Sequence, residues 1–156
     1  MRRAGPLLLA AALAACAAPP PQAPAGPAPA AAQTPPAAGP VNFELSAYEV
    51  VESAEADTLE YVQVYRAGQL LGRTETAAKS RPKLWRGELP EGNWPMRFEV
   101  WDSSDGVSGL RRPDEAQPRE RFMRVEPGQR LGVVLKLFDQ GRQYLYAITR
   151  EPAGKD

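Results

Sequence analysis

The feature that most constrains the fold of this chain is an apolar residue at every second position through much of residues 41–156. Such alternation puts apolar side chains on one face of a strand and polar side chains on the other. No segment carries apolar residues at helical spacing. The clearest alternating sets are Phe43, Leu45, Ala47 and Val51; Val62 and Val64; Met96, Phe98 and Val100; Leu131, Val133, Leu135 and Leu137; and Tyr144, Tyr146 and Ile148. These sets predict half-buried strands around one core.

Turn-forming residues separate the alternating segments. Proline fixes φ and glycine accepts positive φ, which suits both to tight turns. The turn sequences are Ala67-Gly68-Gln69, Pro90-Glu91-Gly92-Asn93, Glu126-Pro127-Gly128-Gln129 and Asp139-Gln140-Gly141-Arg142. Seven to eight short strands joined in this way predict an all-β domain, a single antiparallel β-sandwich of the Ig-like or transthyretin-like kind. Residues 103–120 are polar and contain two prolines, so we expect a long loop there.

The N-terminal residues carry a different signal. Arg2 and Arg3 precede an apolar stretch, residues 6–15, that is far shorter than the roughly 20 residues needed to cross a bilayer as a helix. The stretch ends in Leu13-Ala14-Ala15-Cys16, which resembles the lipobox of a bacterial lipoprotein signal peptide. The resemblance implies that residues 1–15 are removed and that Cys16 is lipidated. The alternative is an ordinary secretory signal that leaves Cys16 as a free thiol.

The lipoprotein resemblance also implies a location. Two or three acyl chains on Cys16 would give a stable membrane anchor. In proteobacterial lipoproteins an Asp after the cysteine marks retention in the inner membrane, and here that position is Ala17. The expected location is therefore the outer membrane, facing the periplasm or the cell surface. Cys16 is the single cysteine of the chain, so we expect no disulfide in the folded domain.

Residues 16–40 are nearly all alanine and proline and cannot build a core. At about 3.1 Å per residue, an extended chain of this length reaches on the order of 70 Å. It is either a tether that lifts the domain from the lipid surface or low-complexity filler. The chain thus divides into a signal peptide (1–15), a lipidated and disordered tether (16–40) and one domain (41–156).

One hairpin suggests a family for the domain. The sequence Gly87-Glu88-Leu89-Pro90-Glu91-Gly92-Asn93-Trp94-Pro95-Met96-Arg97-Phe98 resembles the hairpin of carboxypeptidase-regulatory-like and PEGA-type modules. The turn at residues 125–129, followed by Val133 and Leu135, is similar to their closing hairpin. The resemblance implies a sandwich with a spacer, adhesive or binding role. Pro95 departs from the pattern and would push the start of its strand to a sheet edge.

Composition excludes several kinds of chemistry. The chain has no histidine, which excludes Ser-His-Asp triads and histidine zinc sites. Loss of Arg2 and Arg3 reduces 19 basic side chains to 17 against 19 acidic ones, which argues against a nucleic-acid partner. An enzyme would instead need converging carboxylates, for example Glu88, Glu91, Asp102 or Glu120. We predict no enzymatic activity, no catalytic residue and no cofactor.

Two short motifs could suggest chemistry but have simpler interpretations. Lys79-Ser80 lies in a basic turn with Arg81 and Lys83, where solvated side chains are the simpler expectation. Asp102-Ser103-Ser104-Asp105-Gly106 carries oxygen ligands but lacks the spacing of an EF-hand loop, so we expect a polar turn and no metal site. The charged residues 111–121 form either a contact with an acidic polymer or a partner, or the solvated loop that mixed charges usually indicate.

The remaining candidates for function are aromatic residues next to arginine. Exposed Trp with flanking Arg is typical of recognition surfaces. Burial at the ends of the sandwich is the competing explanation. The candidate binding residues are Trp85, Trp94, Arg97 and Trp101. We therefore expect a non-enzymatic, membrane-anchored lipoprotein that serves a cell-envelope assembly through a protein partner; the alternative is a module that binds glycan or peptidoglycan.

Overall fold

The computed structural model describes residues 41–153, and within this range it contains strands and three short 3-10 turns but no α-helix. The strands are β1 (Phe43–Glu49), β2 (Leu59–Arg66), β3 (Gln69–Arg73), β4 (Ala77–Ala78), β5 (Lys83–Gly87), β6 (Gly92–Ser103), β7 (Leu110–Arg111), β8 (Arg121–Val125), β9 (Gln129–Phe138) and β10 (Gln143–Pro152). The turns are η1 (Ala54–Ala56), η2 (Asp114–Ala116) and η3 (Asp139–Gly141). The prediction of an all-β domain is confirmed.

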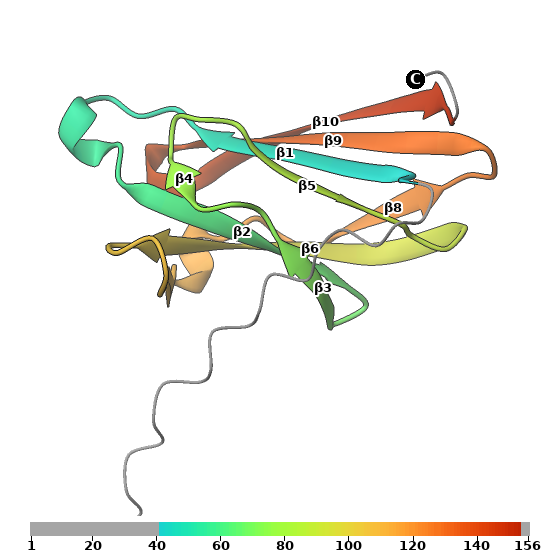
Figure 1. Cartoon of the computed structure of the whole chain (residues 1–156), viewed down its shortest axis with the longest axis horizontal. Coiled ribbons are helices and arrows are strands. Elements are labelled where there is room, and N and C mark those ends of the chain that lie inside the picture. Colours follow the sequence, from blue (N-terminus) through green and yellow to red (C-terminus); the bar gives the residue numbers. More distant parts are fainter. Residues whose placement is uncertain (1–40, 154–156) are drawn as a thin grey trace, which may run out of the picture.

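The strands form two sheets, which appear as an upper and a lower layer in Figure 1. Sheet A has four strands in the order β10-β9-β1-β5. Sheet B follows the path β3-β2-β6-β7, with β4 paired to β2 and β8 paired to β6. Strand β6 holds sheet B together, since it pairs with β2 on one side and with β7 and β8 on the other.

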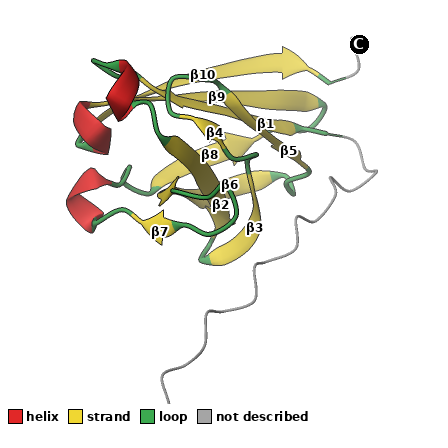
Figure 2. Ribbon diagram, turned by 60° about the vertical axis from the view of Figure 1, so that its left-hand side comes forward, coloured by secondary structure: helices red, strands yellow, loops and turns green. Residues whose placement is uncertain are grey.

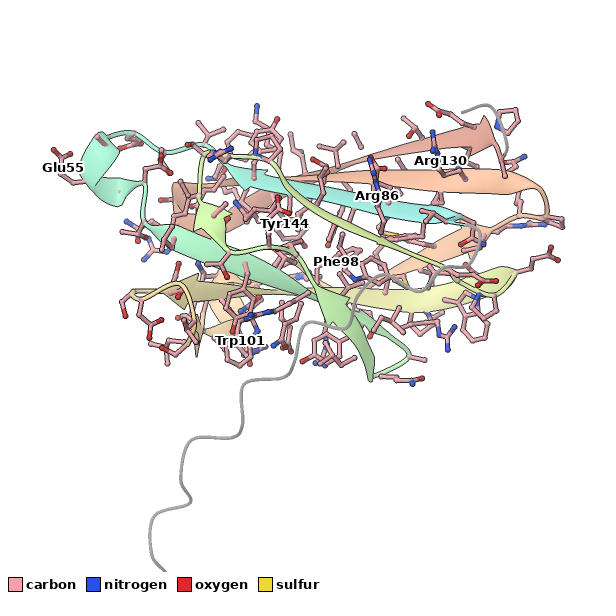
Figure 3. All side chains as sticks on the ribbon, viewed as in Figure 1. Glu55, Arg86, Phe98, Trp101, Arg130 and Tyr144 are labelled. Carbon is pink, nitrogen blue, oxygen red and sulfur yellow. The ribbon has the colours of Figure 1, made fainter. Side chains whose placement is uncertain are left out.

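The core lies between the inner faces of the two sheets. Alternation along β1 buries Phe43, Leu45 and Ala47, and alternation along β9 buries every second residue from Leu131 to Leu137. Sheet B contributes the inward residues of β2, β6 and β8. In Figure 3, Phe98 and Tyr144 lie between the layers. The period-2 pattern of the sequence is thus the burial pattern of the structure.

Three details differ from the expectation. The structure has more strands than the seven to eight expected, because the two-residue strands β4 and β7 leave no alternating pattern. Strands β1 and β9 pair in parallel, with Phe43 opposite Leu131 and Glu49 opposite Leu137, so the pairing is not purely antiparallel. The expected loop at residues 103–120 contains β7 and η2, seen on one side of the molecule in Figure 2.

Pro95 also lies elsewhere than expected. It sits inside sheet B, between the end of β2 and strand β8, and not at an edge. Its carbonyl accepts a hydrogen bond from the amide of Ala67, just past the end of β2. Because the N–H and C=O groups of one strand residue point to the same side, an amide at position 95 would also point past the end of β2. No strand needs that amide as a donor, so proline is tolerated there.

Among the described residues, no helix has the length and apolar character needed to cross a membrane. Cys16, the signal peptide and the tether lie outside the described residues.

Candidate functional site

Two of the four candidate binding residues share one surface. Arg97 and Trp101 lie on β6 at positions that alternate with the buried Phe98 and Val100, so both face outward from sheet B. Figure 3 shows Trp101 on the side of the lower layer that is away from the core. The register places Trp101 between Tyr61 of β2 and Arg111 of β7.

We call this surface the arginine–aromatic face and define it by Tyr61, Tyr65, Arg73, Arg97, Glu99, Trp101 and Arg111. The rings of Tyr61 and Trp101 are nearly parallel, with an interplanar angle of 11° and centroids 6.0 Å apart. Guanidinium groups cover the tyrosines: Arg73 lies 4.6 Å from the ring centroid of Tyr61. Arg97 lies 4.6 Å from that of Tyr65. Each contact is a cation–π interaction that holds the arginine in place.

One carboxylate serves two arginines on this face. Glu99 Oε1 lies 3.3 Å from Arg97 Nη1 and 3.3 Å from Arg111 Nε, and the glutamate side chain is only 8% exposed. Burial, together with the nearby Glu99 charge, raises the pKa of the Tyr65 hydroxyl. Tyr65 donates that hydroxyl to Gln63 Oε1 at 2.6 Å. The charge on the face is therefore one carboxylate against three guanidinium groups, apart from Asp114 at the rim.

Donors outnumber acceptors on the arginine–aromatic face. Three covered N–H groups have no hydrogen-bond partner within the described part of the chain: Arg73 Nε, Arg97 Nε and Trp101 Nε1. Unpaired buried donors are uncommon and need an explanation. An acceptor from outside the domain can reach the exposed parts of the Arg97 and Arg111 guanidinium groups.

The other two candidate tryptophans turn toward the core. Trp85 on β5 packs against core residues, and a side chain added at Gly72 on β3 would lie 2.6 Å from its Nε1. Gly72 thus leaves room for the indole, which fills the open side between β5 and β3. Trp94 also packs against the core, donates to the carbonyl of Pro90 at 2.8 Å and lies under the guanidinium of Arg66. The structure does not bring these two onto the arginine–aromatic face.

A buried charge cluster is the feature that sequence reasoning missed. Its members are Glu49, Glu60, Lys83, Asp102 and Arg112. Arg112 Nη2 contacts Glu49 Oε2 at 2.8 Å, Glu60 Oε2 at 2.7 Å and Asp102 Oδ1 at 2.9 Å. Lys83 Nζ lies 2.9 Å from Glu60 Oε1. Since Glu49 belongs to sheet A and Glu60 and Asp102 to sheet B, Arg112 ties the two sheets together.

The cluster corrects two expectations. Lys83 is not a solvated residue of a basic turn but is fully buried, and it donates to the carbonyls of Ala78, Lys79 and Arg81. Arg112 is not part of a solvated loop either, because only 4% of it is exposed. A signal was present, because Glu49 continues the alternation of β1 and Glu60 that of β2. Charged residues at inward positions need buried partners.

The pKa values of two carboxyl groups in the cluster shift in opposite directions. Loss of solvent raises the pKa of the Glu60 carboxyl, although Lys83 and Arg112 oppose this rise. Partial burial also disfavours ionised Asp102, but hydrogen bonds from Arg112 and the charge of Lys79 outweigh it and hold the pKa of Asp102 below its usual value. Asp102 is therefore engaged by two cations.

The remaining polar motifs are also engaged. Asp105 accepts from the amides of Val107 and Ser108 and from the Ser108 hydroxyl, which lowers the pKa of its carboxyl. Lys79 pairs with Asp102, whereas Ser80 donates to Asp57, so the two neighbours serve different partners. No group of acidic or cysteine side chains among the described residues is arranged to hold a metal ion.

An open hollow of about 480 Å³ lies beside Asp102. The surface of its lining is mostly apolar, although four of the lining residues carry a hydroxyl group. The lining consists of Thr58, Asp102, Ser103, Ser104, Ser108, Gly109 and Leu110. This hollow lies at the β7 end of sheet B.

Strand β10 is an edge of sheet A and pairs only with β9. Two backbone hydrogen bonds show to which side the N–H and C=O groups of β9 and β10 point. The amide of Leu131 donates to the carbonyl of Asn42, and the amide of Ala153 donates to the carbonyl of Gly128. Odd-numbered residues of β10 bond to β9, so the backbone groups of Tyr144, Tyr146, Ile148 and Arg150 point away from the sheet. No backbone group among residues 41–153 bonds to them. Pro152 ends this free edge.

Comparisons of the chain with protein-family models, with curated proteins and with solved structures found no significant match.

Proposed function

We propose that this protein is a non-enzymatic lipoprotein, anchored in the outer membrane through Cys16, whose domain is an interaction module of a cell-envelope assembly. Two layers of strands around one core support an Ig-like or transthyretin-like β-sandwich as its fold. The lipobox and the tether support the anchor.

The free edge of β10 carries the interaction proposal. Four outward-facing residues in this ten-residue strand offer unpaired N–H and C=O groups. Soluble proteins usually protect such an edge with lysine, proline or a bulge, and here proline comes only at Pro152. The neighbouring outer surface of sheet A is partly apolar, with Leu145 62% and Val134 37% exposed. A partner strand added to β10 would satisfy the backbone and cover these side chains.

Replacing Arg150 with proline tests the edge. The change removes one outward amide and places a ring on the edge, but it breaks no bond to β9, since even-numbered residues point away from that strand. After crosslinking in intact cells and affinity purification, the envelope partner recovered with the wild type should be reduced several-fold. Thermal unfolding should be nearly unchanged.

Arg150→Gln is the matched control, because it removes the same charge and keeps the amide. It should recover the partner as the wild type does. Equal recovery by Arg150→Pro, or equal loss in both variants, would show that the β10 edge is not the binding surface.

Replacing Cys16 with serine tests the anchor. Serine cannot be lipidated, so the protein should move from the membrane fraction to the soluble periplasmic fraction and lose acyl labelling. The domain should still fold, as judged by circular dichroism of the purified protein. Membrane association with undiminished acyl labelling would contradict the lipoprotein assignment.

A second candidate function is glycan or peptidoglycan binding, and the hollow beside Asp102 favours it. The hydroxyl groups of Thr58 and Ser104, which bond to no other group among the described residues, offer hydrogen bonds to sugar hydroxyls. Binding to a muropeptide array that Ser104→Ala weakens, with thermal unfolding unchanged, would support this function over the edge-mediated one.

A further inference from the structure

The arginine–aromatic face is a second surface, separate from the β10 edge. It lies on the outside of sheet B, whereas β10 borders sheet A. Trp, Tyr and Arg are the residues most enriched at the centres of protein interfaces, and this face combines all three. Next to it, Phe122 of β8 shares the outward direction and is 63% exposed.

The arginines that cover the tyrosine rings favour a carboxylate over a sugar as the ligand of this face. A sugar binds an aromatic platform by lying on an open ring, but here guanidinium groups already occupy the tyrosine rings. Arginines held in this way present N–H groups at their edges, a geometry that matches the two oxygens of a carboxylate. Arg97 and Arg111 keep 39% and 35% of their side chains exposed for such contacts.

The charge on the face points the same way. Three guanidinium groups stand against one buried carboxylate, which pairs with Arg97 and Arg111 but not with Arg73, and against Asp114 at the rim. We infer that the arginine–aromatic face binds a carboxylate-rich segment of a protein partner. The partner's carboxylates contact Arg73, Arg97 and Arg111, and its apolar side chains contact Trp101 and Phe122.

The spacing of the arginines indicates the form of that segment. Arg73 lies on β3 and Arg111 on β7, at opposite ends of the path β3-β2-β6-β7. Neighbouring strands are about 4.8 Å apart, so a chain that crosses the sheet between these strands spans roughly 14 Å. An extended peptide covers that distance in about four residues. Acidic residues about four positions apart would meet both arginines.

Titration calorimetry with octaglutamate tests the inference on the full-length protein purified in detergent at low salt. The wild type should bind, and the double variant Arg73→Gln/Arg97→Gln should bind about tenfold or more weakly. The matched control is Arg86→Gln/Arg142→Gln, which removes two exposed arginines, one on β5 of sheet A and one just before β10. It should bind within about twofold of the wild type, since screening weakens distant charges.

Three results would overturn the inference: no binding of octaglutamate, equal affinity of the Arg73/Arg97 variant, or an equal loss in the Arg86/Arg142 control. The same titration is repeated with polygalacturonate and with phosphatidylglycerol vesicles in place of octaglutamate. Tighter binding of either, lost in the Arg73/Arg97 variant, would replace the protein segment by an anionic glycan or a lipid surface. Because the edge test changes only Arg150, the two surfaces can fail independently.

Discussion

Replacing Arg112 with alanine is expected to lower the free energy of unfolding by about 3–5 kcal/mol. The guanidinium is the shared partner of Glu49 and Glu60, whose side chains are 2% and 0% exposed. Without it, Glu49 is left as a buried carboxylate with no cation, and Glu60 keeps only Lys83. The desolvation of these groups is then uncompensated. Chemical denaturation monitored by tryptophan fluorescence would measure the loss.

Arg111→Ala is the control for this prediction, because it removes the same kind of side chain from the adjacent position. Arg111 points outward and 35% of its side chain is exposed, so its ion pairs are partly screened. We expect a loss of at most about 1 kcal/mol. Similar losses from the two substitutions would mean that the buried cluster does not hold the sheets together.

Replacing Leu135 with alanine is expected to cost about 2–5 kcal/mol. Leu135 lies in the middle of β9, is fully buried and belongs to the core cluster formed by both sheets. The substitution removes buried methyl groups and leaves a cavity between the layers. Thermal or urea unfolding of the purified protein would give the difference in the free energy of unfolding from the wild type.

Val134→Ala provides the comparison within the same strand. Val134 faces outward from sheet A and is 37% exposed, so its truncation should cost about 1 kcal/mol or less. A loss well under about 1 kcal/mol for Leu135→Ala would contradict the inward assignment of that strand face.

The sequence predicts the strands far better than their arrangement. Alternation at Phe43, Leu45 and Ala47 indicates which face is buried because side chains alternate strictly along a strand. It does not indicate which strand lies next to which. The parallel pairing of β1 with β9 depends on contacts across more than half of the chain, and no local pattern encodes it.

The candidate site shows the same limit. Arg97 and Trp101 flank Phe98 and Val100 in an alternating segment, so the period-2 pattern implies that both point outward, and they do. Trp85 turns inward because Gly72, on another strand, leaves room for it. That contact cannot be inferred from the sequence. Arg112 lies in a segment whose mixed charges suggest solvent. Its partners come from three strands, so only the tertiary structure reveals them.

The central position of β1 affects how the chain can fold. Sheet A needs its first strand between β5 and β9, with Phe43 beside Leu131, so it cannot assemble before the C-terminal quarter of the chain is present. Pairings across such long sequence separations slow folding, because the chain loses the entropy of closing the loop before any stabilising contact forms. The lipoprotein that we propose would cross a membrane as an extended chain, and slow assembly would be an advantage to it. In that case the topology itself would slow folding during export.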